Sequence, residues 1–291
     1  MTIDSDSAAF APAPATLYPV ATPIGNLRDI TLRALDVLAA VDCVAAEDTR
    51  VSGGLLRHYG IQSKLIALHA HNERSQAARI IDLLRQGRSV ALISDAGTPG
   101  MSDPGALVVA AVRDAGFAIV PIPGASAVTA LVSVAGWAVA PFTFVGFLPA
   151  RPAARRAELL RLADAPQAFV FYEAPHRIVE LLDDLAACFG GERRITLGRE
   201  LTKRFESIHE STLAEAVQWT AGDPDRQRGE FVLIVEGAHV KAEDSLTPVD
   251  RKTFELLLAE LPASRAAKLA ADLTGKPRAS FYQIALGKEQ E

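Results

Sequence analysis

Cysteine is scarce in this sequence, which argues against a disulfide framework. The 291 residues include two cysteines, Cys43 and Cys188, which lie far apart in apolar or helical patterns. Such usage suits buried thiols in a reducing compartment better than a disulfide. We therefore expect a cytosolic protein.

Basic residues are absent from the first 27 positions, and charge is absent from residues 115–150. A secretory signal peptide needs a basic start and an apolar stretch, so we expect residues 1–15 to be a disordered lead-in instead. Four prolines and four glycines divide residues 115–150 into pieces shorter than the roughly 20 residues of a bilayer span. We interpret this segment as buried core and expect no membrane partner.

Strand-like apolar runs alternate with helical patterns from residue 16 to residue 124, which predicts a mostly parallel sheet. The expected strands are 17–21, 43–47, 89–94 and 118–124, and the expected helices are 31–41, 75–87 and 106–116. Farther along, strands are expected at 142–149, 167–175, 193–201, 204–212 and 228–237, with helices at 126–136 and 176–190. Consecutive strands of this kind predict a mixed or antiparallel sheet.

These patterns predict an α/β protein with several parts. After the lead-in come an N-terminal α/β domain (16–124) and a second α+β domain (125–241). Residues 242–291 are expected to form a polar linker (242–249) and a small helical domain resembling a helix-turn-helix.

The loop LISDAGTPGMSDPG, Leu92–Gly105, leaves the carboxyl end of a predicted strand, where ligands of open α/β sheets bind. It contains neither a lysine-bearing P-loop nor a G-x-G-x-x-G turn, and Asp95 and Asp103 would repel phosphates. A neutral or cationic ligand is therefore expected, with a tight surface turn as the alternative. S-adenosylmethionine, a sulfonium without phosphate, meets that description. Two further Pro/Gly turns, 18–31 and 121–128, could converge with this loop on one crevice.

Nine motifs in order carry a resemblance to a known family: LYPVATPIGNLRDITLRAL, AAEDTRVSGGLL, HNE, SDAGTPGMSDPG, PIPGASAVTAL, GFLP, FYEAPHRI, GRELTKRFE and GEFVLIVEG. The sequence resembles the ribosomal RNA small subunit methyltransferase I family, a branch of the tetrapyrrole methylase superfamily. The resemblance implies a two-domain tetrapyrrole-methylase-like fold and S-adenosylmethionine as methyl donor. It also implies 2′-O-methylation of a cytidine in the decoding region of 16S rRNA, a homodimer and a cytoplasmic setting.

The resemblance also implies a set of cofactor-binding residues: Pro23, Ala96, Gly97, Thr98, Met101, Ser126, Ala127, Glu173 and Phe231. Two departures stand out. The first turn reads TPIGN where tetrapyrrole methylases generally have a GPGDP-type turn, which disfavours a porphyrinoid substrate. Gly100 occupies a position where the nearer family more often has a bulky apolar residue.

Three charged residues are candidates for the catalytic site. A ribose hydroxyl is a poor nucleophile, so a nearby base or a cation that stabilises the emerging alkoxide would accelerate transfer. Lys203 in GRELTKRFE is the preferred cation, although a solvated strand edge is the alternative. Glu47 and Arg50 follow a predicted strand, and an ion-paired helix cap explains them equally well.

His69 and His71 have no further ligands at metal-binding spacing, so no metal is predicted. Substrate contact or a hydrogen-bonded loop is expected for His71, Asn72 and Glu73.

The net charge of −5 gives no global attraction to nucleic acid, so RNA contact requires local basic patches. Residues 151–161 hold four arginines and one glutamate, and the C-terminal domain supplies Arg265, Lys268, Lys276, Arg278 and Lys288. Solvated helix faces are the alternative, but we expect both regions to contact 16S rRNA or the small ribosomal subunit.

The sequence leaves two competing functions open. They are a precorrin-type tetrapyrrole C-methyltransferase and a non-catalytic RNA-binding assembly factor.

Overall fold

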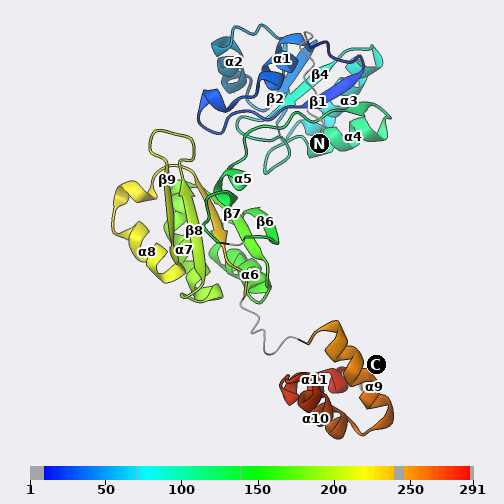
Figure 1. The fold of residues 1–291 in the computed structure, drawn as a ribbon. Helices are drawn as coiled ribbons and strands as arrows, with labels where there is room; N and C mark the ends of the chain where they lie inside the picture. The colour runs from blue at the N-terminus through cyan, green and yellow to red at the C-terminus, as the bar shows by residue number, and fades with distance from the viewer. Residues whose placement is uncertain (1–9, 70, 138, 239–245, 289–291) are drawn as a thin grey trace. The chain divides into compact units, whose positions relative to one another are not determined.

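The computed structural model describes residues 10–69, 71–137, 139–238 and 246–288. The chain divides into two compact units, Met1–Gly237 and Ala238–Glu291 (Figure 1). Most of the predicted lead-in and part of the predicted linker lie outside the described residues. No helix in the described ranges is long and apolar enough to span a membrane.

The first sheet is entirely parallel and has the strand order β3-β2-β4-β1-β5. Its strands are β1 (Thr16–Pro19), β2 (Cys43–Ala46), β3 (Leu65–Ala67), β4 (Val90–Ile93) and β5 (Ala118–Ile119). Every residue of β2 and β4 is buried, as expected for strands covered on both faces. This confirms the expected parallel sheet, although β3 is a strand that the sequence analysis missed.

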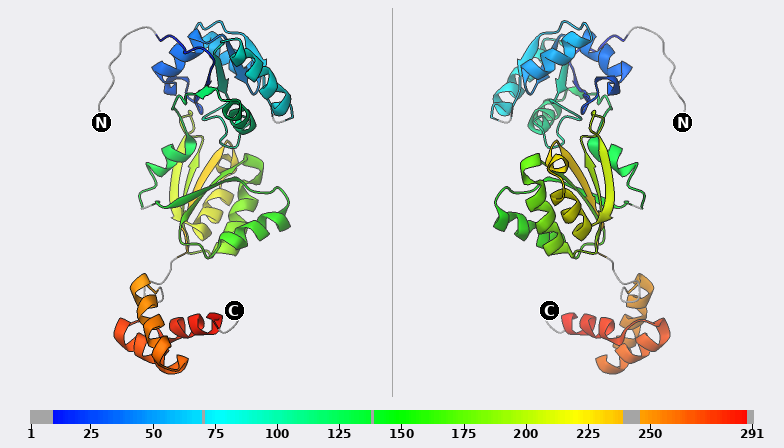
Figure 2. Two further views of the ribbon diagram at one scale, coloured as in Figure 1. Left: turned by 90° about the vertical axis from the view of Figure 1, so that its right-hand side faces the viewer. Right: turned by 90° about the vertical axis from the view of Figure 1, so that its left-hand side faces the viewer.

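Helices cover both faces of this sheet (Figure 2). They are α1 (Leu32–Ala40), α2 (Thr49–His58), α3 (Glu73–Arg85) and α4 (Ala106–Asp114). Side chains of α3 and α4 pack with Leu17 and Leu92 on one face. Those of α1 and α2 pack with Tyr18 and Ala91 on the other. Neighbouring strand residues therefore point into opposite cores, so the strands read as continuous apolar runs.

The second sheet is mixed, as expected, with the order β6-β7-β10-β8-β9. Its strands are β6 (Phe142–Phe147), β7 (Ala168–Glu173), β8 (Arg194–Arg199), β9 (Ser207–Thr212) and β10 (Phe231–Val235). Among the described strand pairs of this second sheet, only β6–β7 is parallel. The strand expected at 204–212 begins at Ser207, because residues 201–205 form a turn.

Helix α5 (Ala127–Val132) packs on one face of the second sheet. Helices α6 (Pro152–Leu162), α7 (Ile178–Phe189) and α8 (Leu213–Ala221) pack on the other. Three short 3-10 turns complete the unit: η1 (Leu27–Asp29), η2 (Pro175–Arg177) and η3 (Pro224–Gln227). The charge-free segment 115–150 is only partly core. Leu131 is fully buried, but Val134 and Phe147 are 47% and 55% exposed.

The second unit contains α9 (Pro248–Glu260), α10 (Ala263–Thr274) and α11 (Arg278–Lys288) around a small core that includes Phe254 and Phe281. Thr247 and Asp250 form a capping box at the start of α9. The helix thus begins inside the segment expected to be a linker.

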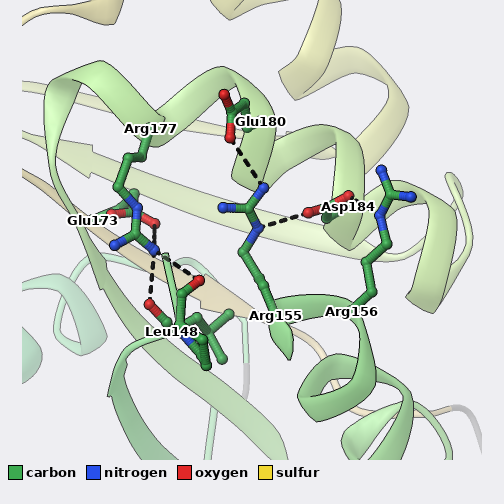
Figure 3. Close-up of polar contacts among 8 residues, drawn as sticks. Leu148, Arg155, Arg156, Glu173, Arg177, Glu180 and Asp184 are labelled. Atoms are coloured by element: carbon green, nitrogen blue, oxygen red, sulfur yellow. Dashed lines mark hydrogen bonds and ion pairs between the residues drawn. The ribbon is translucent and has the colours of Figure 1, made fainter. Parts of the chain in front are cut away.

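Arg155 differs from the other arginines of segment 151–161, because its side chain is buried and is not available for the RNA contact expected of this region. Its side chain is 1% exposed, and its Nε lies 2.6 Å from Oδ2 of buried Asp184 on α7 (Figure 3). A second bond joins Arg155 Nη2 to Glu180 at 3.2 Å. Arg155 therefore ties α6 to α7, while Arg151, Arg156 and Arg161 remain exposed.

Replacing Arg155 should destabilise the first unit. In Arg155→Met, Asp184 stays buried with only Arg156 as an ionic partner, and breaking a buried pair in this way costs about 3–5 kcal/mol. Urea unfolding followed by circular dichroism measures the loss. Arg161→Met, on the same helix but exposed, is the control and should change stability by less than about 0.5 kcal/mol. Equal effects of the two substitutions would contradict the structural role.

Candidate functional site

A cavity of about 380 Å³ lies within the first unit and is lined by segments from the parts of the chain that carry each of the two sheets. Its volume falls in the range typical of small-molecule sites. Five segments supply most of the lining: the loop after β4, the start of α5, the end of β7, the turn after β8 and the start of β10. The lining residues are Ile24, Ala96, Gly97, Thr98, Met101, Ser102, Asp103, Ser126, Ala127, Phe147, Tyr172, Glu173, Ala174, Pro175, Leu201, Lys203, Glu230, Phe231 and Val232.

The structure brings most of the proposed cofactor residues to this cavity. Ala96, Gly97, Thr98, Met101, Ser126, Ala127, Glu173 and Phe231 line it, and so does Lys203. Pro23 is not among the lining residues, but its neighbour Ile24 is. Glu47 and Arg50 are also outside the lining.

Two main-chain hydrogen bonds join the first turn to the loop after β4. Thr22 N–H donates to Gly97 O at 2.9 Å, and Gly97 N–H donates to Thr22 O at 3.1 Å. Gly97 has a φ of +77°, and a Cβ there would lie 3.4 Å from Ile24 Cγ2. Glycine is therefore favoured at this position by backbone conformation and by close packing.

The turn before α5 completes the convergence of the three Pro/Gly turns. Thr98 Oγ1 lies 3.5 Å from Ala125 O, while Val20 and Ile122 form a parallel bridge. Three turns that are far apart in the sequence thus meet at one cavity, as expected from their positions at the carboxyl ends of parallel strands.

Glu73 holds the far end of the loop after β4. Its buried carboxylate accepts main-chain N–H groups of Gly105 at 2.9 Å and Leu107 at 2.8 Å. These are orphan donors at the start of α4, where Gly105 has no side chain with which to cap the helix. Asn72 bonds to His69 N–H and Ala67 O. A hydrogen-bonded loop therefore accounts for Asn72 and Glu73.

Lys203 is an ion-paired cation at the edge of the cavity. Its Nζ lies 2.9 Å from Glu200 Oε1 and 3.0 Å from Glu230 Oε2. Desolvation lowers the pKa of Lys203, but the two carboxylates outweigh it, so the pKa lies above its ordinary value. A Cβ on Gly25 would come within 2.4 Å of Lys203 Cγ, so the first turn packs directly on this side chain.

Arg50 belongs to a helix cap. Asp48 is the N-cap of α2 and accepts the Arg50 N–H, while the Arg50 guanidinium pairs with its carboxylate at 2.6 Å. The hydrogen bond from the Arg50 side chain holds the pKa of Asp48 down to about 2. Glu47 lies nearby and accepts the Asp95 N–H at 3.4 Å. The structure therefore shows Arg50 in an ion-paired helix cap, which was one of the two interpretations that the sequence left open.

Glu173 is a buried carboxylate held by a specific set of donors (Figure 3). Its Oε1 accepts the Ala174 N–H at 2.8 Å, and Oε2 lies 3.1 Å from Arg177 Nη2. Arg177 Nη2 also donates to Leu148 O at 2.7 Å. Desolvation raises the pKa of Glu173, and Arg177 opposes this shift. The motifs GFLP and FYEAPHRI are thus joined through Arg177.

Asp103, which the sequence predicts only to repel phosphates, lines the cavity. Desolvation, with the negative charges of Glu47 and Asp95, raises its pKa to about 6, while a hydrogen bond with Ser94 acts in the opposite direction. Its position in the glycine-rich loop was visible in the sequence. Its approach to Glu47 depends on the order of the strands, which the sequence does not show.

Unusual backbone conformations concentrate beside the cavity. The described residues include four non-glycine positions with positive φ: Ala15, Ser102, Glu200 and Thr202. Ser102 lines the cavity. Glu200 and Thr202 lie on either side of Leu201, which lines the cavity together with Lys203. Such conformations persist where surrounding structure over-determines them, which is common at functional sites. Within the described ranges, no group of three or more His, Cys, Asp or Glu side chains could hold a metal ion.

Comparison with known proteins gives a consistent result. The family model described as Tetrapyrrole (Corrin/Porphyrin) Methylases matches residues 16–217, and the model described as RsmI C-terminal HTH domain matches 245–289. A protein of Xylella fastidiosa strain Temecula1 named ribosomal RNA small subunit methyltransferase I is 51% identical, covering 92% of this chain and 98% of its own. A Pseudomonas aeruginosa protein of the same name is 49% identical, with 94% and 98% covered.

Solved structures share the fold at lower identity. Uroporphyrin-III-C-methyltransferase from Thermus thermophilus has a TM-score of 0.54 at 22% identity and covers 76% of this chain and 94% of its own. The methyltransferase CobJ has a TM-score of 0.57 at 19% identity, with 80% and 95% covered. At these identities the likeness establishes the architecture alone.

Replacing Arg177 should expose the dependence of Glu173 on its partner. Arg177→Met leaves a carboxylate buried without a cation and should lower the free energy of unfolding by about 3 kcal/mol. The pKa of Glu173 in the folded state then rises further. Because the folded protein retains that proton more tightly than the unfolded chain, stability should fall as pH rises from about 4.5 toward the folded pKa.

Urea unfolding between pH 5 and pH 8 measures this effect. The double variant Arg177→Met/Glu173→Gln should recover part of the loss and remove the added pH dependence, because no buried charge remains. If Arg177→Met alone matched the wild type at pH 8, the ion pair would have no structural role.

Proposed function

Because the chain belongs to the ribosomal RNA small subunit methyltransferase I family of the tetrapyrrole methylases, we propose that it methylates small-subunit rRNA with S-adenosylmethionine as donor. The acceptor is the 2′-hydroxyl of a cytidine ribose in the decoding region of 16S rRNA. The observation that carries this proposal is about 50% identity to proteins of that name over more than nine tenths of both chains. The protein works in the cytoplasm as a homodimer.

The cavity suits a cationic donor without phosphate. Residues 96–98 border it, and a side chain at Gly97 would crowd Ile24, which also lines the cavity. Apolar side chains such as Met101 and Phe231 provide a dry surface, while Asp103 and Glu173 add acidic character. Ala96, Gly97, Thr98, Met101, Ser126, Ala127, Glu173 and Phe231 would hold the donor, with Pro23 supporting the first turn. The bound donor supplies an electrophilic methyl group, and the chain's residues orient it and exclude water.

Lys203 contributes the cation beside the reacting hydroxyl. An ammonium has three N–H donors, and Glu200 and Glu230 account for two hydrogen bonds. The remaining donor can stabilise negative charge that develops on the ribose oxygen. Glu47 acts at a distance through its charge, and Arg50 shapes the start of α2.

RNA is held by basic side chains away from the cavity. The exposed Arg151, Arg161 and Arg204 supply positive charge in the first unit. Arg265, Lys268 and Arg278 do so in the helical unit, which matches the family's C-terminal HTH model.

In our proposal the chain is organised as domains 16–124, 125–241 and 242–291, with the donor cavity between the first two. The TPIGN turn argues against a tetrapyrrole substrate.

Transfer of a labelled methyl group tests the proposed function. Small subunits and 16S rRNA from cells lacking the enzyme should accept label on the ribose of one cytidine, located by mass spectrometry of nuclease fragments. Label on a base or on a tetrapyrrole would contradict the proposal. RNA binding without any transfer would support the assembly factor instead.

Gly97→Val should weaken donor binding about ten- to a hundredfold, the effect of roughly 1–3 kcal/mol of overpacking. Isothermal titration calorimetry measures the affinity. Gly100→Val is the matched control, because Gly100 also has positive φ (+82°) but a Cβ there meets nothing within 4 Å. Both variants carry backbone strain, so equal donor affinities would refute the assignment of Gly97 to the donor site.

Lys203→Met should lower turnover about a hundredfold while changing donor affinity less than threefold, because the lysine acts on the acceptor oxygen. Arg204→Met, which alters an exposed cation one residue away, should leave turnover intact and raise the KM for RNA. Steady-state kinetics and calorimetry separate the two effects. Parallel losses of turnover and donor affinity in Lys203→Met would remove it from this role.

A further inference from the structure

We propose that Asp103 is the general base that accepts the proton of the ribose 2′-hydroxyl. This inference rests on the proposed function and adds a residue to its mechanism. Three carboxylates line the cavity within the described residues: Asp103, Glu173 and Glu230. Two of them are committed to cations, since Glu173 pairs with Arg177 and Glu230 with Lys203. No ion pair is described for Asp103, so its carboxylate can accept a proton.

The backbone around Asp103 fixes its place between the two sheets. Ser102 has a φ of +69°, and its Oγ lies where a Cβ on Gly146 of β6 would come within 3.0 Å. Two residues beyond Asp103, Gly105 is held by the buried carboxylate of Glu73. The aspartate is therefore anchored on both sides, and it lines the same cavity as Met101 and Lys203. A base needs such a fixed position to meet one hydroxyl.

The charges around Asp103 suit proton transfer near neutrality. Two negative charges face Asp103, those of Glu47 at the end of β2 and Asp95 after β4, while Ser94 donates a hydrogen bond to it. Burial raises the pKa of the Tyr172 hydroxyl on β7, and Tyr172 is close enough for the Asp103 charge to raise that pKa further. Burial is the largest cause of its shift, and its pKa of about 6 leaves it mostly ionised at pH 7. A base of this pKa is both deprotonated and basic enough to be effective at that pH.

The step balances without any redox partner. The ribose 2′-oxygen forms a bond to the methyl carbon as the carbon–sulfur bond breaks, and the electron pair of that bond remains on sulfur. The hydroxyl proton passes to a carboxylate oxygen of Asp103, which later releases it to water. Lys203 stabilises the oxygen while the proton leaves.

Asp103→Asn tests the proposal, because it keeps the size of the side chain but removes the base. Turnover on small subunits should fall about 10²- to 10⁴-fold, while donor affinity by calorimetry changes less than threefold. Wild-type kcat/KM should rise tenfold per pH unit below about pH 6 and level off above it, because Asp103 must be ionised. The asparagine variant should lack this limb.

Asp95→Asn is the matched control. It removes one negative neighbour, which lowers the pKa of Asp103, so the acidic limb should move to lower pH while the plateau stays within threefold of wild type. A second readout needs no turnover. Carbon-13 NMR of labelled aspartates, with the Asp103 signal assigned by its loss in Asp103→Asn, should show titration near pH 6 rather than near 4.

The outcomes separate this inference from the function on which it rests. If wild-type protein transfers no methyl group to rRNA, the proposed function fails and the role of Asp103 fails with it. If wild type is active and Asp103→Asn keeps turnover within threefold, the proposed function stands and Asp103 is not the base. An Asp103 signal that titrates near pH 4 would also overturn the inference.

Discussion

The reciprocal main-chain hydrogen bonds between Thr22 and Gly97 are the contact on which the rest of the site depends. They join the turn after β1 to the loop after β4, two neighbouring strands of the parallel sheet. Beside this pair, Ile24 packs against Gly97, and Gly25 packs against Lys203 in the turn after β8. One backbone pairing thus sets the positions of both the loop after β4 and the Lys203 side chain.

The cavity combines burial with a controlled set of charges. Lys203 bridges two carboxylates, and Arg177 joins Glu173 to the main chain of the GFLP motif. Partial burial makes each of these charges stronger in effect than it would be in water. A methyl transfer between a sulfonium and a hydroxyl gains from such a fixed and dry environment.

The sequence predicted much of the fold because its apolar runs have clear periods. Both sheets and most long helices followed from these patterns, whereas three-residue β3 is too short to show one. The amphipathic α8 was missed as well, although Thr212 and Glu215 form a capping box that could have marked its start. The burial of Arg155 was not predicted, because it depends on a pairing with Asp184, 29 residues away, that no local pattern reveals.

The candidate site was predicted through the resemblance and through strand-end loops, and the remaining parts depend on tertiary packing. The pairing of Arg50 with Asp48 is an exception, because the two residues are neighbours in one turn and the sequence already offered an ion-paired cap as one of two interpretations. The surroundings of Asp103 depend on the meeting of β2, β4 and β7, which no local pattern shows.

A crystal structure of the protein with bound S-adenosylmethionine tests the central claim most directly. The account predicts density in the cavity, with the donor in hydrogen-bond contact with the main chain of residues 96–98 and its methyl group facing Asp103 and Lys203. Density at any other place on the chain, with this cavity filled only by water, would contradict it.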